Sequence, residues 1–199
     1  DKLPRPSYLP TNTVLNLYDK DNDIRYNAYF TYDSIDAQTV PDFMITYCKK
    51  WPGNPELYEG KSNNINKTKA FRISEMYLIA AEAYAMSGDE TNASAMLNKL
   101  KTARVKGWSD KSYKGDALIK EIQDEYVREL FGEQPYFFDL KRWKKGLNRS
   151  SSEAQDISYL PALGTDMVKS ADDHMWVWPI PKDEIDANPQ IKGQQNAGY

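Results

Sequence analysis

The sequence predicts a mostly α-helical fold in which an αα-hairpin stands between long irregular segments. Apolar residues recur at steps of three and four over residues 71–86 and again over residues 90–105, which is the period of an α-helix. Gly88 separates the two runs, and glycine ends a helix without strain in the left-handed conformation. A link this short requires the two helices to pack antiparallel. Residues 1–65 contain six prolines, which disfavour long helices there.

The two helices of the hairpin each present one predicted apolar face. These faces are Ile73, Met76, Tyr77, Ala80, Ala81 and Tyr84 in the first helix, and Ala93, Met96, Leu97, Leu100 and Ala103 in the second. Asp89 offers a side-chain oxygen to cap the second helix. The layout is that of one tetratricopeptide unit, but no second copy follows at a period of ~34 residues. Since one such unit cannot cover its own apolar faces, we expect it to pack on other parts of this chain or on a missing N-terminal segment.

The rest of the sequence predicts one further long helix and several short elements. A third helix begins near Asp116, whose side chain can cap it, and ends at Gly132–Pro135; its apolar stripe is Leu118, Ile119, Ile122, Tyr126, Val127, Leu130 and Phe131. Shorter elements are predicted as strands or turns over 26–32 and 43–47, a helix over 138–145 and a helical turn over 183–187, which Asn188-Pro189 would break. We therefore expect one domain over residues 1–199, with an irregular segment (1–65), a helical core (66–145) and an irregular C-terminal segment (146–199).

The charge balance and the cysteine and histidine counts exclude several functional classes. With 26 basic and 29 acidic residues the net charge is −3, so the chain lacks the positive footprint of a nucleic-acid-binding protein. No apolar stretch reaches the length of about 18 residues that a membrane span needs. Cys48 and His174 are single residues of their types, which excludes an intrachain disulfide and a zinc site built from them. Cys48 is predicted to be a small buried residue and His174 a surface residue.

Many charged residues of the helical region raise the question of catalysis. They are Arg72, Glu75, Glu82, Arg104, Glu125, Arg128, Glu129, Glu133, Asp139, Lys141 and Arg142. Paired carboxylates perform acid–base chemistry in glycosidases, but these acids alternate with arginines at helical spacing, as Glu125 and Arg128 do. Because a nearby arginine lowers the pKa of a carboxylic acid, whereas a catalytic acid needs a raised one, we predict structural ion pairs and no enzymatic activity.

An aspartate-rich turn near the start resembles the beginning of a calcium-binding loop. Residues 19–23 place aspartate at alternate positions, but Ile24 and Phe30 stand where such a loop requires glycine and glutamate. We therefore expect turn-forming acids, with Asp23 paired to Arg25. The sequence predicts no metal and no cofactor.

The aromatic residues, 14 Tyr, 6 Phe and 5 Trp, divide into two groups. Tyr77, Tyr84, Tyr126 and Phe131 keep helical spacing and are predicted to be core residues, and Trp176 and Trp178 are predicted to pack beside the Pro-Ile-Pro segment that follows. Tyr47, Trp51, Asn54 and Tyr58 instead lie in a stretch of loop composition, with Lys49, Lys50 and Glu56 as further polar groups. Aromatic faces on rigid loops can stack a sugar ring while amides bind its hydroxyls. We take these four residues as candidate ligand-binding residues; alternatively, the loop packs the irregular segment or faces a partner protein.

Three segments together resemble the SusD/RagB family. The first is Phe71-Arg72-Ile73-Ser74-Glu75-Met76-Tyr77-Leu78-Ile79-Ala80-Ala81-Glu82-Ala83-Tyr84 with Ala95-Met96-Leu97-Asn98 and Arg104. The second is Glu125-Tyr126-Val127-Arg128-Glu129-Leu130-Phe131-Gly132-Glu133 with Phe138-Asp139-Leu140-Lys141-Arg142-Trp143. The third is Trp178-Pro179-Ile180-Pro181 with Glu184-Ile185, Asn188-Pro189 and Gln195-Asn196-Ala197-Gly198-Tyr199. Asp23-Ile24-Arg25 is a weaker fourth similarity. Residues 134–136 depart from the family pattern, which has a glycine and a basic residue there.

The resemblance implies a SusD-like helical fold with tetratricopeptide-type helix pairs and long irregular loops. It also implies non-catalytic capture of oligosaccharides, or of peptides in some members, and their delivery to a SusC-like TonB-dependent transporter in the outer membrane. Complete family members are much longer, so we expect their lipid anchor, which makes the membrane contact at the cell surface, on an N-terminal part missing from this sequence; Cys48 lies too far inside to carry it. A peptide-binding member and a helical scaffold without a soluble ligand remain the alternatives.

Overall fold

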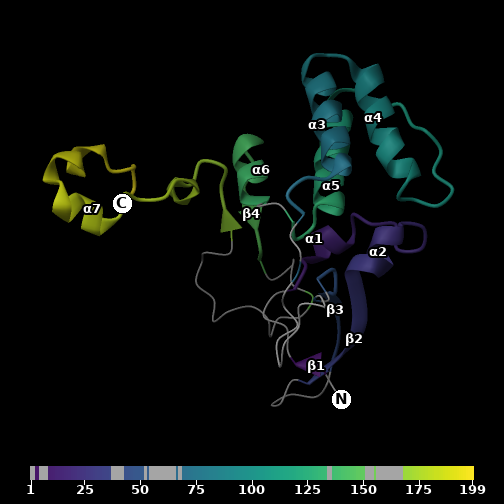
Figure 1. Cartoon of the computed structure of the whole chain (residues 1–199), viewed down its shortest axis with the longest axis horizontal. Coiled ribbons are helices and arrows are strands. Elements are labelled where there is room, and N and C mark those ends of the chain that lie inside the picture. Colours follow the sequence, from purple (N-terminus) through teal and green to yellow (C-terminus); the bar gives the residue numbers. More distant parts are fainter. Residues whose placement is uncertain are drawn as a thin grey trace. The chain divides into compact units, whose positions relative to one another are not determined.

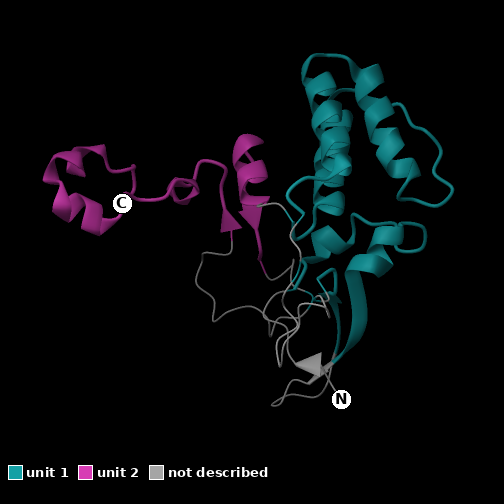
Figure 2. Ribbon diagram, viewed as in Figure 1, with its two compact units in different colours: residues 1–134, 151–160 teal, residues 135–150, 161–199 magenta. Residues whose placement is uncertain are grey.

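The computed structural model describes residues 3–4, 9–36, 43–51, 53, 66, 69–133, 136–150, 155 and 168–199. The chain divides into two compact units (Figure 2). Unit 1 comprises residues 1–134 and 151–160, and unit 2 comprises residues 135–150 and 161–199.

Three helices form the largest part of unit 1: α3 (Ile73–Met86), α4 (Glu90–Thr102) and α5 (Gly115–Glu129). α3 packs against both α4 and α5 (Figure 1). Gly88 adopts a φ of 84° between α3 and α4, and the side chain of Asp89 accepts a hydrogen bond from the backbone N–H of Asn92 at 3.0 Å. The predicted αα-hairpin, its glycine stop and its aspartate cap are therefore confirmed.

The three helices share an aliphatic core. Its buried members are Leu78 and Ala81 of α3, Ala93, Leu97 and Leu100 of α4, and Leu118 and Ile122 of α5. Each buried leucine or isoleucine contributes about 1.5–3 kcal/mol relative to an exposed one. This core confirms much of the stripe predicted for the third helix and the inward position of Ala81.

The buried side of α3 differs from the predicted one. Ser74, Leu78 and Ala81 face the core, whereas Ile73 and Tyr84 are 74% and 38% exposed. The prediction failed because α3 is apolar on almost every side, so periodicity alone could not indicate which side meets α4 and α5.

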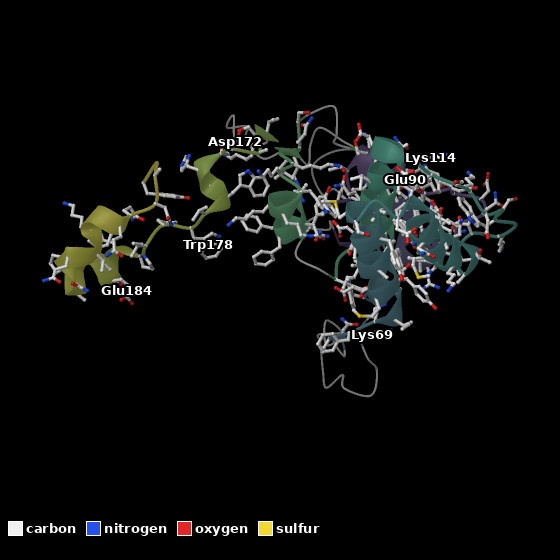
Figure 3. All side chains as sticks on the ribbon, turned by 90° about the horizontal axis from the view of Figure 1, so that it is seen from above. Lys69, Glu90, Lys114, Asp172, Trp178 and Glu184 are labelled. Carbon is white, nitrogen blue, oxygen red and sulfur yellow. The ribbon has the colours of Figure 1, made fainter. Side chains whose placement is uncertain are left out.

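The start of α5 also differs from the predicted one. Asp116 does not cap the helix: Lys114 occupies the cap position and makes no side-chain capping hydrogen bond. Instead Glu90, at the start of α4, accepts a hydrogen bond from the Gly115 backbone N–H at 2.7 Å, so the two helix starts meet (Figure 3). A negative side chain is favourable at the positive end of the helix dipole.

A small three-stranded sheet and two short helices complete unit 1. The strands are β1 (Leu3–Pro4), β2 (Phe30–Asp36) and β3 (Phe43–Cys48), in the order β1-β2-β3, and β2 pairs antiparallel with β3 from Phe30↔Cys48 to Ile35↔Phe43. The helices are α1 (Asn12–Leu15) and α2 (Ile24–Tyr29). Residues 26–29, predicted as strand, lie in α2 because the Asp23 side chain caps this helix by accepting from the Arg25 backbone N–H at 2.9 Å. Cys48 is half-buried, and burial raises the pKa of its thiol.

An aromatic cluster joins the end of α5 to the sheet. Leu15, Tyr18 and Phe30 are buried, and Phe131 packs on them with its ring 5.0 Å from that of Phe30. Tyr18 also donates a hydrogen bond to the carbonyl oxygen of Arg128 at 2.9 Å. The residues that follow α5 are therefore held firmly against β2.

Within the described residues, unit 2 contains only short elements. They are α6 (Tyr136–Arg142), β4 (Leu147–Asn148), β5 (Val168–Lys169), η5 (His174–Trp176), α7 (Lys182–Ala187) and η6 (Pro189–Gln194). Trp176 is buried against Phe137, as predicted for a packed ring. The same prediction is wrong for Trp178, which is 79% exposed (Figure 3). The carbonyl oxygens of Val177 and Trp178 accept hydrogen bonds from the Tyr199 hydroxyl and the Asn196 side-chain amide, and these hold the backbone with the ring turned to the solvent. His174 is exposed, with its ring against that of Tyr199.

Within the described residues, no helix has both the length and the apolar character that crossing a membrane requires.

Candidate functional site

The acidic residues of α5 lie in a buried ionic cluster. Glu125 and Glu129 are both fully buried, one turn apart on this helix. We define the ionic cluster by its members: the acids Asp23, Glu121, Glu125, Glu129 and Glu133, and the bases Arg25, Lys50, Arg72, Lys101, Arg104 and Arg128. The structural ion pairs predicted for the central helices are therefore confirmed for Glu125, Arg128, Glu129, Glu133, Arg72 and Arg104.

Glu125 contacts three cations. Its carboxylate accepts from Arg25 at 2.6 Å and from Arg128 at 2.7 Å, and Lys101 Nζ lies 3.3 Å away. Burial alone would raise the pKa of Glu125, but these three cations outweigh it and lower the pKa to about 2. The carboxylate is therefore charged at neutral pH.

Arg25 reaches from α2 into the centre of the cluster. Its side chain is 3% exposed and contacts Glu125, Glu129 at 2.9 Å and Asp23 at 2.7 Å. The predicted local pair of Asp23 and Arg25 is confirmed. The longer reach to α5 was not predicted, because no local spacing relates residues 100 positions apart.

Glu129 joins the α5 helix to two other segments. Arg104, just after α4, donates to both of its carboxylate oxygens at 2.9 Å, and Arg72, just before α3, contacts it as well. Burial acts to raise the pKa of Glu129, while the hydrogen bonds from Arg104 and the nearby arginines lower it overall. Such forked contacts fix geometry as well as charge.

Glu133 holds together the two ends of the segment that contains the candidate loop. Lys50, two residues after β3, places Nζ 2.5 Å from Glu133 Oε1 and donates to the Phe131 carbonyl oxygen at 2.7 Å. Arg72 contacts the same Glu133 oxygen. Lys50 and Arg72 flank residues 51–71, so one carboxylate fixes both stems of this segment. We call Lys50, Arg72 and Glu133 the Glu133 clamp.

Trp51 lies directly beside the clamp. Trp51 is 38% exposed, and Lys50 Nζ lies 5.8 Å from the centroid of its ring. Gly132 has a φ of 71°, and a Cβ added there would lie 3.1 Å from Trp51 Nε1. The turn after α5 therefore needs glycine both for its backbone conformation and for the close approach of the indole.

The structure describes two of the four predicted ligand-binding residues, and they lie on different elements. Tyr47 is half-buried in β3, paired with Thr31 of β2, while Trp51 lies against the turn after α5. Asn54, Glu56 and Tyr58 are outside the described residues. Lys50 corrects one expectation: its ammonium group, predicted as a ligand contact, bonds inside the clamp with a side chain only 9% exposed. Sequence reasoning missed the clamp because its three members lie far apart along the chain.

The aspartate-rich turn is held by its own backbone. Asp19 accepts from the backbone N–H groups of Asp21 at 3.2 Å and Asn22 at 3.1 Å, and hydrogen bonds from the side chain and backbone of Asn22 lower its pKa. Among the described residues, no group of three or more histidine, cysteine, aspartate or glutamate side chains is arranged to hold a metal ion.

The sequence profile of the SusD family matches residues 41–199. The chain belongs to the SusD family. The SusD match covers the clamp, Trp51 and the three segments that carried the predicted resemblance; the weaker similarity at residues 23–25 lies before it. The mostly helical SusD-like fold is thus confirmed.

Solved structures of SusD-type proteins share this fold. A proposed sugar-binding protein from Bacteroides vulgatus is 29% identical with a TM-score of 0.69, and the match covers 95% of this chain and 39% of that one. A SusD superfamily protein from Bacteroides thetaiotaomicron is 26% identical with a TM-score of 0.69, over 94% and 40% of the two chains. NanU of B. fragilis, 20% identical with a TM-score of 0.58 over 94% and 38%, shares the fold. The chain thus spans about two fifths of the length of these relatives. No curated protein sequence matches it.

Proposed function

We propose that this SusD-family chain takes part in the non-catalytic capture of oligosaccharides at the cell surface and in their delivery to a SusC-like TonB-dependent outer-membrane transporter. The observation that carries the proposal is the Glu133 clamp. It fixes both stems of residues 51–71 and seats the partly exposed Trp51 ring on the turn after α5. A rigidly held aromatic ring loses little freedom when it stacks on a sugar, and this favours binding.

The lowered pKa values and the burial of the carboxylates argue against glycoside hydrolysis. A glycosidase needs one carboxylic acid with a raised pKa and a second carboxylate that can reach the substrate. The pKa of Glu125 is about 2 and that of Glu129 is also lowered, and both side chains are fully buried among arginines and a lysine. These groups suit a scaffold better than an acid–base pair.

The ligand chemistry follows from the residues near the clamp. Tyr47, Trp51 and Tyr58 would supply stacking faces and Asn54 an amide for hydroxyl groups. The description of the Bacteroides vulgatus relative as a proposed sugar-binding protein supports an oligosaccharide. In this proposal the membrane contact is made by a lipid anchor outside residues 1–199, as in an outer-membrane lipoprotein.

Affinity electrophoresis of the complete gene product in gels that contain glycans tests the proposal. We expect glycan-dependent retardation that Trp51→Ala abolishes with little change in thermal stability. Trp178→Ala is the matched control, since it removes an equally large and more exposed ring from unit 2, and it should leave retardation unchanged.

Three results would count against glycan capture. Failure to bind any glycan while a peptide panel binds would favour the peptide-binding alternative. Co-purification of a barrel transporter without any soluble ligand would favour the scaffold alternative. Measurable hydrolysis of glycosidic substrates, lost in Glu125→Gln, would refute the argument from charge pairing.

A further inference from the structure

The side-chain amide of Gln155 binds both backbone hydrogen-bonding groups of one residue in β3. Its Oε1 accepts from the Thr46 N–H at 2.8 Å, and its Nε2 donates to the Thr46 carbonyl oxygen at 2.7 Å. Nε2 also donates to the Pro10 carbonyl oxygen at 2.9 Å, so both hydrogens of the amide are used. Two residues of adjacent antiparallel strands exchange the same pair of bonds. The amide therefore stands where a residue of a further strand would lie.

Thr46 belongs to the outer edge of the sheet. In the described part of the chain, β3 is the last strand in the order β1-β2-β3, and it lies beside β2 (Figure 1). Thr46 is opposite Tyr32 of β2, yet its N–H and C=O bond Gln155, so these groups point away from β2. Because the direction of these groups alternates along a strand, those of Met44 and Cys48 point to the same outer side.

The composition of β3 gives this edge little protection of its own. The strand Phe43–Cys48 contains no charged residue and no proline, although both are common means of keeping further strands from an edge. Aromatic and β-branched residues favour strands, and short uncharged segments of this kind readily pair with other chains. Met44 is 47% exposed. An edge of this composition needs a group that occupies its hydrogen bonds.

Elsewhere in the described residues, two side-chain amides bind a single residue in the same way but away from a strand. Asn98 of α4 accepts from the Lys111 N–H at 3.1 Å and donates to the Lys111 carbonyl oxygen at 2.9 Å. In unit 2, Gln195 makes the same two contacts with Ile180 at 2.8 and 3.1 Å. Lys111 and Ile180 lie outside the helices and strands. These two amides hold loops, whereas that of Gln155 covers the edge of a sheet.

We infer that Gln155 closes the outer edge of β3 against strand addition by a second copy of this chain. Without the Gln155 amide, the outer groups of Thr46 are open, and the β3 edges of two copies pair with each other about a two-fold axis. This inference goes beyond glycan capture and does not depend on it.

Sedimentation of the complete gene product tests the closure. Gln155→Leu removes the donor and the acceptor, and we expect a several-fold larger fraction of dimers than in the unaltered protein at the same concentration. Gln195→Leu is the matched control, since it removes the same pair of contacts from Ile180, and it should leave the dimer fraction unchanged. Addition of Met44→Lys to Gln155→Leu should restore the monomer, because lysine on an edge strand opposes pairing.

Hydrogen exchange of a milder variant tests the contact itself. Gln155→Asn is one methylene shorter and stays polar, so it cannot reach both groups of Thr46, and the Thr46 amide proton should exchange several-fold faster. A folded Gln155→Leu protein that stays monomeric would refute the closure, as would association that Met44→Lys does not reverse. Unchanged exchange at Thr46 in Gln155→Asn would refute it even where Gln155→Leu does not fold.

Discussion

Glu125 and Trp51 lie in two regions of unit 1 that differ in their exposure to solvent. Glu125 is fully buried and bonded to three cations, while Trp51 remains 38% exposed beside the clamp. The buried region is fixed by charge pairing, and the exposed region displays a ring with no charge of its own. The comparison teaches that the buried acids of unit 1 stabilise its scaffold, while the proposed recognition rests on residues that the scaffold holds in place.

Removal of a buried acid should have the largest effect on stability. Glu125→Ala leaves Arg25 and Arg128 buried without their shared partner, and breaking a buried ion pair in this way costs about 3–5 kcal/mol. Urea unfolding of residues 1–199 measures the change. Asp124→Asn, which breaks the exposed Lys120–Asp124 pair on the same helix, should cost below about 1 kcal/mol. Equal costs for the two substitutions would show that burial does not set the strength of these pairs.

A charge placed between the helices should cost nearly as much. Ala81 is fully buried, so Ala81→Asp introduces an unpaired charge into the helical core and should reduce the free energy of unfolding by about 3 kcal/mol or more. Ala83→Asp, two residues away on the exposed side of α3, should cost below about 1 kcal/mol in residues 1–199 because that site is open to water. Unchanged thermal stability of Ala81→Asp would contradict the packing of α3 on α4 and α5.

Acid should lower the free energy of unfolding over a defined pH range. The pKa of Glu125 falls from the usual 4.5 to about 2 on folding, so its stabilisation is fully present above pH 4.5 and is lost as the pH falls toward 2. The shift corresponds to roughly 3 kcal/mol, and the lowered pKa of Glu129 adds to it in the same direction. Unfolding free energies measured across this range should fall with decreasing pH, and less steeply in Glu125→Gln. A flat profile in the unaltered chain would contradict the pairing.

The clamp should affect binding more than stability. Glu133→Gln removes the charge that Lys50 and Arg72 share, and because these groups are nearer the surface the cost should be about 1 kcal/mol. The glycan affinity of the complete gene product should nevertheless decrease, since the stems of residues 51–71 would be held less firmly. A Glu133→Gln variant that binds glycan with full affinity would show that the clamp does not support the binding site.

The sequence predicted what local spacing determines. The hairpin, its Gly88 stop and its Asp89 cap follow from neighbouring residues, and so does the pairing of Glu125 with Arg128. The buried side of α3 could not be predicted, since a helix that is apolar on nearly all sides gives no periodic contrast.

Contacts between distant segments were beyond prediction for a different reason. Arg25 meets Glu125 across 100 residues, and Lys50, Arg72 and Glu133 converge from three separate segments. A single sequence contains no spacing that relates such positions. For the candidate site, the loop and the charge pairing could each be predicted, whereas the support that the Glu133 clamp gives to this loop could not.

One measurement tests most directly whether the buried acids are structural: the stability and the glycan binding of Glu125→Gln, compared in the same preparation of the complete gene product. We predict a clearly lower free energy of unfolding, while the folded fraction binds glycan with unchanged affinity. Unchanged stability together with lost glycan binding or lost hydrolysis would place Glu125 in a functional site and contradict the account.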